Sequence, residues 1–263
     1  MSRPTVDIVI PVQRESAMLE GCVESVERFT TNYNIHIMND AGLNVSEARQ
    51  AAMDTLPVGR YVCFLDDDSR MIHDGWLDAL MDTMVPNDDV AVAFAEEMWG
   101  DEFVVNTYNG PKHHVEYGPA ACMLIDTERV PDAVRWNKYI GLRSGWLGGD
   151  FEEVEYAHQL MHHGKSLVGV HGSMFKHIDR PPMEEFRKTD RAHTCVIMQA
   201  LIRYWAQNCP DNGEFFQKLR YVKANENNDC MLAPGQSLKK CFHGVLADNH
   251  LRHFPMFKTW GIA

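Results

Sequence analysis

Two clusters of acidic side chains stand where they could hold a metal ion or move a proton. In the first cluster, Asp66, Asp67 and Asp68 directly follow an apolar run at residues 61–65. Three adjacent carboxylates repel one another unless a cation or hydrogen-bond donors intervene, and their hard oxygen atoms suit Mg²⁺ or Mn²⁺. A solvated acidic turn or a helix cap is the alternative interpretation. The position after an apolar strand favours a metal site.

The second acidic cluster lies within residues 148–155, where two glycines precede Asp150, Glu152 and Glu153. Carboxylates at the start of a helix are stabilised by free backbone N–H groups, and this effect alone would explain one or two of them. The glycine pair permits a sharp turn or the close approach of a ligand. A carboxylate at this position could act as a general base toward an acceptor hydroxyl.

The elements that must position these clusters alternate between strand and helix. Short apolar, β-branched runs predict strands at residues 6–12, 34–38, 61–65, 90–94, 121–125, 167–170 and 173–175. Apolar residues at helical spacing predict helices at 19–29, 46–56, 74–84 and 151–163, and one or two more within 184–207. Strand–helix alternation over the first 65 residues predicts a parallel sheet covered on both faces. Ser46 is the expected cap of the second helix.

Charge is distributed unevenly along the 263 residues. The net charge is −12, but residues 1–187 carry 15 Lys and Arg against 31 Asp and Glu (net −16), whereas residues 188–263 carry net +4. A uniformly acidic surface would repel nucleic acid and anionic membranes. The basic tail could still face a phosphorylated or polyanionic acceptor, although an ordinary helical cap is the alternative interpretation.

Compartment signals are few. Seven scattered cysteines without a C-x-x-C pair indicate neither a disulfide framework nor a zinc ribbon, so we expect a reduced, cytoplasmic setting. No uninterrupted apolar run approaches ~18 residues, so no transmembrane segment is expected.

The order and spacing of motifs over residues 5–180 resemble the inverting family 2 glycosyltransferases of the GT-A fold. The strand at 6–12 resembles the first strand of that family, and residues 39–42 (Asn-Asp-Ala-Gly) are similar to its Asn/Asp-Asp-Gly-Ser turn, with Ala and Gly in place of Gly and Ser. Residues 46–50 (Ser-Glu-Ala-Arg-Gln) are similar to its Ala-Arg-Asn segment, with Gln in place of Asn. Residues 64–68 (Phe-Leu-Asp-Asp-Asp) are similar to its D-x-D strand end.

The second cluster also fits the resemblance. Residues 151–155 (Phe-Glu-Glu-Val-Glu), followed by Gly164, keep the spacing of the family's Gly-Glu-Asp-x-Asp helix, and Glu153 stands where its aspartate base usually stands. The turn before Asp150 also resembles the Trp-Gly-Gly-Glu turn of related GT-A transferases, so Asp150 is the rival base. His177, thirteen residues after Gly164, falls where many members place a histidine that contacts the metal or the diphosphate.

The resemblance implies a role for each matched residue. The implied catalytic group is Glu153 or Asp150, with Glu152 beside them. The implied metal ligands are Asp68 and His177, with Mn²⁺ or Mg²⁺ as the ion. The implied donor-binding residues are Pro11, Gln13, Glu15, Asp40, Arg49, Asp66 and Asp67. Arg49 and His177 are expected to help neutralise the diphosphate.

The resemblance further implies an α/β fold of the GT-A type: a Rossmann-like mixed, mainly parallel sheet flanked by helices. We expect a nucleotide-sugar-binding and catalytic domain at residues 1–180 and a mostly helical, acceptor-side extension at 181–263. The implied reaction is metal-dependent transfer of a sugar from a nucleotide-diphosphate donor, a UDP-sugar, to an acceptor hydroxyl with inversion. A catalytically silent nucleotide-sugar-binding module and a retaining GT-A transferase are the alternatives. The acceptor (a glycan, a lipid-linked sugar or a modified nucleic-acid base) and the oligomeric state are left open.

Overall fold

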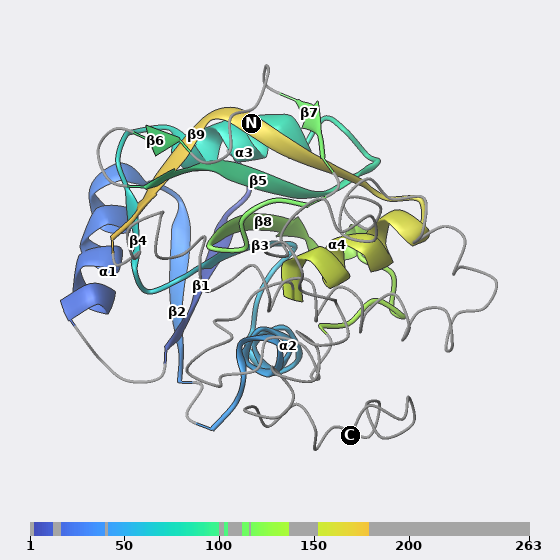
Figure 1. Cartoon of the computed structure of the whole chain (residues 1–263), viewed down its shortest axis with the longest axis horizontal. Coiled ribbons are helices and arrows are strands. Elements are labelled where there is room, and N and C mark those ends of the chain that lie inside the picture. The colour runs from blue at the N-terminus through green and yellow to red at the C-terminus, as the bar shows by residue number, and fades with distance from the viewer. Residues whose placement is uncertain are drawn as a thin grey trace, which may run out of the picture. The chain divides into compact units, whose positions relative to one another are not determined.

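Apolar runs and helical repeats form elements close to the ranges that the sequence predicts. The computed structural model describes residues 3–12, 17–39, 42–99, 103–104, 112–115, 117–136 and 152–178, all within one compact unit (Figure 1). The first half contains β1 (Val6–Val12), α1 (Ala17–Phe29), β2 (Tyr33–Asn39), α2 (Val45–Thr55), β3 (Tyr61–Leu65), β4 (Ser69–Met71) and α3 (Trp76–Met84). The second half contains β5 (Val90–Trp99), β6 (Phe103–Val104), β7 (His113–His114), β8 (Cys122–Asp126), the 3₁₀ turn η1 (Thr127–Arg129), α4 (Glu152–His162) and β9 (Ser166–His177).

The strands form one mixed sheet, which confirms the predicted fold class. Its order is β2-β1-β3-β8-β5-β9-β4, with β6 beside β5 and β7 beside β9. The pairs β1–β2, β1–β3 and β5–β9 are parallel, whereas β8 pairs antiparallel with both β3 and β5. Strands β2, β1, β3, β5 and β9 therefore run in one direction, and their carboxyl ends meet at one edge of the sheet.

Side-chain alternation divides the core into two layers. Ile8 and Ile10 of β1 pack in a buried cluster with residues of α1 and α3, whereas Val9 packs with residues of α2 and α4. Successive side chains of a strand point to opposite faces, so α1 and α3 cover one face and α2 and α4 cover the other. All residues of β1 and β3 are buried, as expected for parallel strands covered on both faces.

Strand β9 differs from its prediction. The two predicted segments at 167–170 and 173–175 are one strand interrupted by a bulge, because the β5 partners step from Ala95 to Glu96 while the β9 partners step from Val170 to Met174. Gly172 has a φ of 88°, and its N–H donates to the buried Glu96 carboxylate at 3.3 Å. The bulge absorbs the extra residues, so β9 continues to His177 at the carboxyl edge.

The helix expected within residues 184–207 and the tail that contains it lie outside the described residues, so the domain boundary near residue 180 stays a prediction. None of the helices within the described ranges combines the length and the hydropathy of a membrane span.

A buried aspartate fixes the amino-terminal edge of the sheet. Asp7 is 5% exposed and accepts hydrogen bonds from Gly59 N–H at 2.7 Å and Asn34 Nδ2 at 3.0 Å, and it lies 2.8 Å from His36 Nε2. Burial by itself would raise the pKa of Asp7. The hydrogen bonds from Gly59, His36 and Asn34 outweigh that effect, so its pKa lies below the usual range.

This geometry makes a pH-dependent contribution to stability. Because the pKa of Asp7 is lower in the folded chain than in the unfolded chain, its ionised form stabilises the fold above the ordinary aspartate pKa of about 3.9. That stability is lost as the pH falls through the lower, folded pKa. We expect Asp7→Asn to reduce the free energy of unfolding by about 1–3 kcal/mol at pH 5, because buried donors lose a charged acceptor. Urea unfolding from pH 5 to pH 2 should show this difference shrinking, and a difference that is constant over the range would contradict the assignment.

Candidate active site

Strand pairing brings three side chains that could hold a metal ion together at the carboxyl edge. Asp66 follows β3, and the N–H of Ser69 donates to its carbonyl at 3.0 Å, which closes the turn that leads into β4. In the antiparallel pair β4–β9, Ser69 stands opposite His177, and the N–H of Ile178 donates to the carbonyl of Asp68 at 3.1 Å. The last residue of β9 is thereby fixed beside the aspartate turn.

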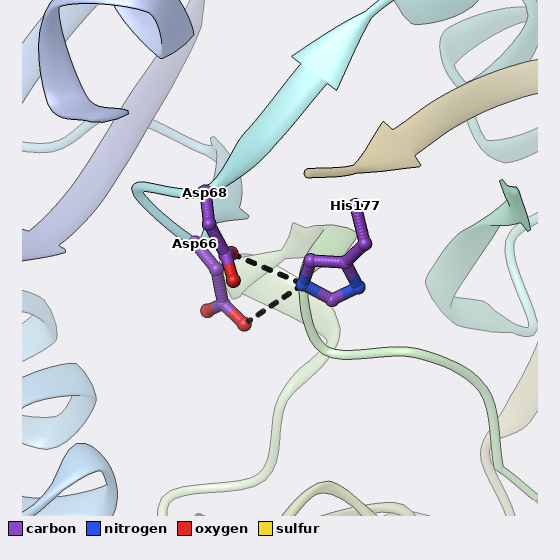
Figure 2. Close-up of side chains that lie close together, drawn as sticks. All are labelled: Asp66, Asp68 and His177. Atoms are coloured by element: carbon purple, nitrogen blue, oxygen red, sulfur yellow. Dashed lines mark ion pairs between the residues drawn. The ribbon is translucent and has the colours of Figure 1, made fainter. Parts of the chain in front are cut away.

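Figure 2 shows the result. Nε2 of His177 lies 3.1 Å from Oδ1 of Asp68 and 4.0 Å from Oδ2 of Asp66. One donor atom from each of the three residues lies within 4.8 Å of the others, and the two aspartates are partly exposed whereas the histidine is buried. Two carboxylate oxygens and one imidazole nitrogen form a donor set that fits Mn²⁺, and the carboxylates also fit Mg²⁺.

The structure therefore brings together the two residues predicted as metal ligands, Asp68 and His177. It adds Asp66, which the resemblance places among the donor-binding residues. Whether these residues bind a metal in solution stays a prediction.

Glu97 of β5 holds the other nitrogen of the histidine ring. Its Oε1 is in hydrogen-bonding contact with Nδ1 of His177, and both side chains are buried. A carboxylate on one imidazole nitrogen sets the ring orientation and leaves the other nitrogen directed at a metal. The sequence analysis missed Glu97. It could have been found, because residues 96 and 97 follow the predicted strand at 90–94, and the residues after a strand end were expected to carry the site.

We predict that Glu97→Gln weakens Mn²⁺ binding by about 10–100-fold, because the ring loses the charged acceptor that orients it. Titration of the protein followed by the electron paramagnetic resonance signal of free Mn²⁺ measures this affinity. Glu96→Gln is the matched control, since Glu96 is a buried neighbour whose carboxylate accepts from the N–H of Gly172 in the β9 bulge, and successive side chains of a strand point to opposite faces of the sheet. Equal Mn²⁺ affinity in the wild type and Glu97→Gln would rule out this role.

A buried arginine lies behind the aspartate turn. Arg49 is 1% exposed; its Nη1 donates to Oε1 of Glu152 at 2.6 Å, and its Nη2 donates to Oδ1 of Asp66 at 3.1 Å. Its guanidinium carbon lies 5.1 Å from the ring centre of Trp136 and 6.0 Å from that of Phe64. The described contacts thus join a charged group on α2 to the end of β3 and to the start of α4.

The start of α2 is fixed by a local motif. The side chain of Asn44 accepts a hydrogen bond from the N–H of Glu47, and the Glu47 carboxylate accepts one from the N–H of Asn44. This is a reciprocal capping box. The cap is therefore Asn44 and not the expected Ser46. Ser46 is the second residue of the helix, and its side chain is buried.

Burial and charge pairing act in opposite directions on the pKa values of Arg49 and Glu152. Burial raises the pKa of Glu152, and the opposing effect of the Arg49 guanidinium does not cancel it. Burial works to lower the pKa of Arg49, but the Glu152 and Asp66 carboxylates outweigh it and raise that pKa. Arg49 therefore stays charged. Glu153, the next residue of α4, is half-buried.

The remaining predicted site residues divide into two groups. Pro11 is a buried residue of β1, and Asp67 is partly exposed in the turn after β3. Gln13, Glu15, Asp40 and Asp150 lie outside the described residues. The donor-binding and catalytic roles given to all of these positions stay predictions.

Solved structures share this architecture. GalNAc-T7, in a crystal structure with UDP, GalNAc and Mn²⁺, superposes with a TM-score of 0.53 at 13% identity over 97% of this chain and 58% of its own. TarS of S. aureus superposes with a TM-score of 0.52 at 10% identity over 76% of this chain and 43% of its own. The chain has the GT-A fold. It spans little more than half the length of the first of these GT-A structures and less than half of the second. No protein-family model matches the sequence, and no curated protein is significantly similar to it.

Proposed function

We propose that this chain is a metal-dependent glycosyltransferase that moves a sugar from a UDP-sugar to an acceptor hydroxyl with inversion at the anomeric carbon. The observation that carries the proposal is the group of Asp66, Asp68 and His177 at the carboxyl edge of a GT-A sheet. The GT-A structure of GalNAc-T7 was solved with UDP and Mn²⁺. This supports the same donor class and ion here.

The charge at this edge explains why a metal is part of the proposal. Both phosphates of the donor would enter a site that already contains two aspartates. A bound divalent ion would neutralise the diphosphate and stabilise it as a leaving group. Asp66, Asp68 and His177 would hold the ion, and Glu97 would keep the His177 ring turned toward it.

Glu153 is the proposed base. It stands in the first turn of α4, where free backbone N–H groups favour a carboxylate, and it is partly exposed. Glu152 is buried and its Oε1 is paired with Arg49, so it is poorly placed to reach an acceptor. Glu153 would remove the proton of the acceptor hydroxyl as that oxygen attacks the anomeric carbon. Asp150 remains the rival base.

The acceptor side is proposed for residues 181–263, as expected from the basic tail, and the acceptor classes stay a glycan, a lipid-linked sugar or a modified nucleic-acid base. A cytoplasmic setting is also part of the proposal. Cys22, Cys63 and Cys122 support it, because all three are buried free thiols.

The metal assignment is tested at Asp68. We expect Asp68→Asn to lower Mn²⁺-dependent release of UDP from a panel of UDP-sugars by at least about 100-fold, because a charged ligand is lost, and to leave the melting temperature unchanged. Asp82→Asn is the control, since Asp82 is an exposed aspartate paired with Arg3. Full activity of Asp68→Asn would overturn the metal site. A wild-type chain that binds UDP but never releases it from a UDP-sugar would be the silent binding module.

The base is tested at Glu153. We expect Glu153→Gln to lower transfer by about 10²–10⁴-fold, as for loss of a general base, while the affinity for UDP and Mn²⁺ is retained. Isothermal titration of UDP separates the two effects. The same loss in Asp150→Asn, with Glu153→Gln active, would assign the base to Asp150. The anomeric configuration of the product, read by NMR, distinguishes inversion from retention.

A further inference from the structure

We infer that Arg49 is a positioning residue. It orients the carboxylate of Asp66 within the metal group, by which we mean Asp66, Asp68 and His177, and it links that carboxylate to the start of α4. This inference rests on the proposed function, because it concerns the same metal group. It differs from the role that the resemblance implies, in which Arg49 belongs to the donor-binding residues and helps to neutralise the diphosphate.

The guanidinium of Arg49 is enclosed by other parts of the chain. The side chain is 1% exposed, and both of its terminal nitrogens donate to carboxylates of the chain. Trp136 and Phe64 lie over the guanidinium at distances typical of cation–π contact. A guanidinium that is paired and covered in this way has little surface to offer a ligand.

The carboxylate of Asp66 is divided between two neighbours. Its Oδ1 accepts from Arg49 at 3.1 Å, and its Oδ2 is the oxygen that lies 4.0 Å from Nε2 of His177. Because a carboxylate is planar, fixing Oδ1 also fixes the direction of Oδ2. Arg49 thereby turns one oxygen of Asp66 toward the ring that also contacts Asp68.

The other end of the link is α4. Arg49 reaches Glu152, 103 residues away in the sequence, at the first position of that helix. Trp136 packs at the same junction. Its ring stacks on that of Tyr156 of α4, with ring centroids 4.2 Å apart and an interplanar angle of 3°, and it also lies over the Arg49 guanidinium. Glu153 follows Glu152 directly, so one guanidinium connects the metal-facing aspartate with the turn of helix that carries the proposed base.

The energetics favour positioning over stability as the reason for this arrangement. One buried guanidinium faces two carboxylates, and Oε2 of Glu152 and Nε of Arg49 are buried without a hydrogen-bond partner among the described residues. Burying charges carries a large desolvation cost, and apolar residues of similar volume often stabilise a core equally well. A network with buried polar atoms that lack a hydrogen-bond partner adds little stability to the helix junction. Its orientation of Asp66 is therefore the better explanation for its presence.

The test compares metal and nucleotide binding. Arg49→Lys keeps the charge, but one ammonium cannot reproduce the fork that spans two carboxylates. We expect its affinity for Mn²⁺ in the absence of nucleotide to fall by about tenfold or more, as for loss of an outer-shell partner. Arg60→Lys is the matched control, because Arg60 makes a two-point pair with the buried Asp126 at the opposite end of β3.

A second variant covers the case in which Arg49→Lys folds poorly. Arg49→Met combined with Glu152→Leu removes the buried pair as a unit and leaves no unpaired charge at the α4 junction, so the fold should be retained. Asp66 still loses its partner, and Mn²⁺ affinity should fall as in Arg49→Lys. Amide hydrogen exchange gives an independent readout: Mn²⁺ should slow exchange in α4 of the wild type and not in the double variant.

Each outcome decides the matter. Unchanged Mn²⁺ affinity in folded Arg49 variants overturns the inference, and if UDP affinity falls at the same time, Arg49 contacts the diphosphate instead. Mn²⁺ affinity that falls in both Arg49 variants but not in Arg60→Lys supports it. A wild-type chain that binds no Mn²⁺ overturns the proposed function and this role together, whereas normal Mn²⁺-dependent transfer with insensitive Arg49 variants overturns this role alone.

Discussion

Carboxylates that repel one another are held together at the carboxyl edge of the sheet by two nitrogen-bearing side chains. The carboxylates belong to Asp66, Asp68, Glu97 and Glu152, and the nitrogen-bearing side chains are those of Arg49 and His177. In the partly buried surroundings of this edge, unpaired charges would interact far more strongly than in water. The strand ends and the first turn of α4 must therefore place each carboxylate within reach of a partner, and this requirement links elements that are distant in the sequence.

Arg49 and His177 pair with different carboxylates. Arg49 is buried and pairs with the carboxylates of Glu152 and Asp66 on the side that faces α4. The two ring nitrogens of His177 lie instead against Glu97 on one side and the aspartates on the other. The aspartate group stays partly exposed on its other side. That asymmetry leaves a closed half around the buried Arg49 and a partly exposed half where the aspartates could hold a metal ion. This arrangement is the physical basis for proposing transfer chemistry at this end of the sheet.

The net charge of −12 acquires a clearer meaning from this arrangement. Part of the acidity of the first 187 residues is concentrated at the carboxyl edge, where it is paired or suited to a metal. Acidity of this kind does not repel anionic ligands in the way a uniformly acidic surface does, because a bound cation reverses the local sign. The repulsion of nucleic acid and anionic membranes that is expected of a uniformly acidic surface therefore does not extend to this edge once a cation is bound there.

Much of the fold could be predicted because its signals are local. β-branched runs predicted β1 and β3 with the bounds that the structure has, and helical spacing predicted α1 and α2 to within two residues at either end. Local signals failed where two nearby caps competed, as at Asn44 and Ser46. They also failed in β9, because a bulge depends on the pairing of β9 with β5 and not on its own residues.

The sequence by itself determined that three aspartates gather after the strand at residues 61–65, and the resemblance of its motifs to a known family implied that Asp68 and His177 belong to one site. Only the tertiary structure decided their partners. Glu97 lies 80 residues before His177, and Arg49 lies 103 residues before Glu152. Such pairs depend on strand register and on the rotation of a helix about its axis. Both are determined by packing interactions distributed over the whole core. No short stretch of sequence carries that information, so the motifs could place Asp68 and His177 in one site, whereas the pairing of Glu97 with His177 and of Arg49 with Glu152 could not be predicted.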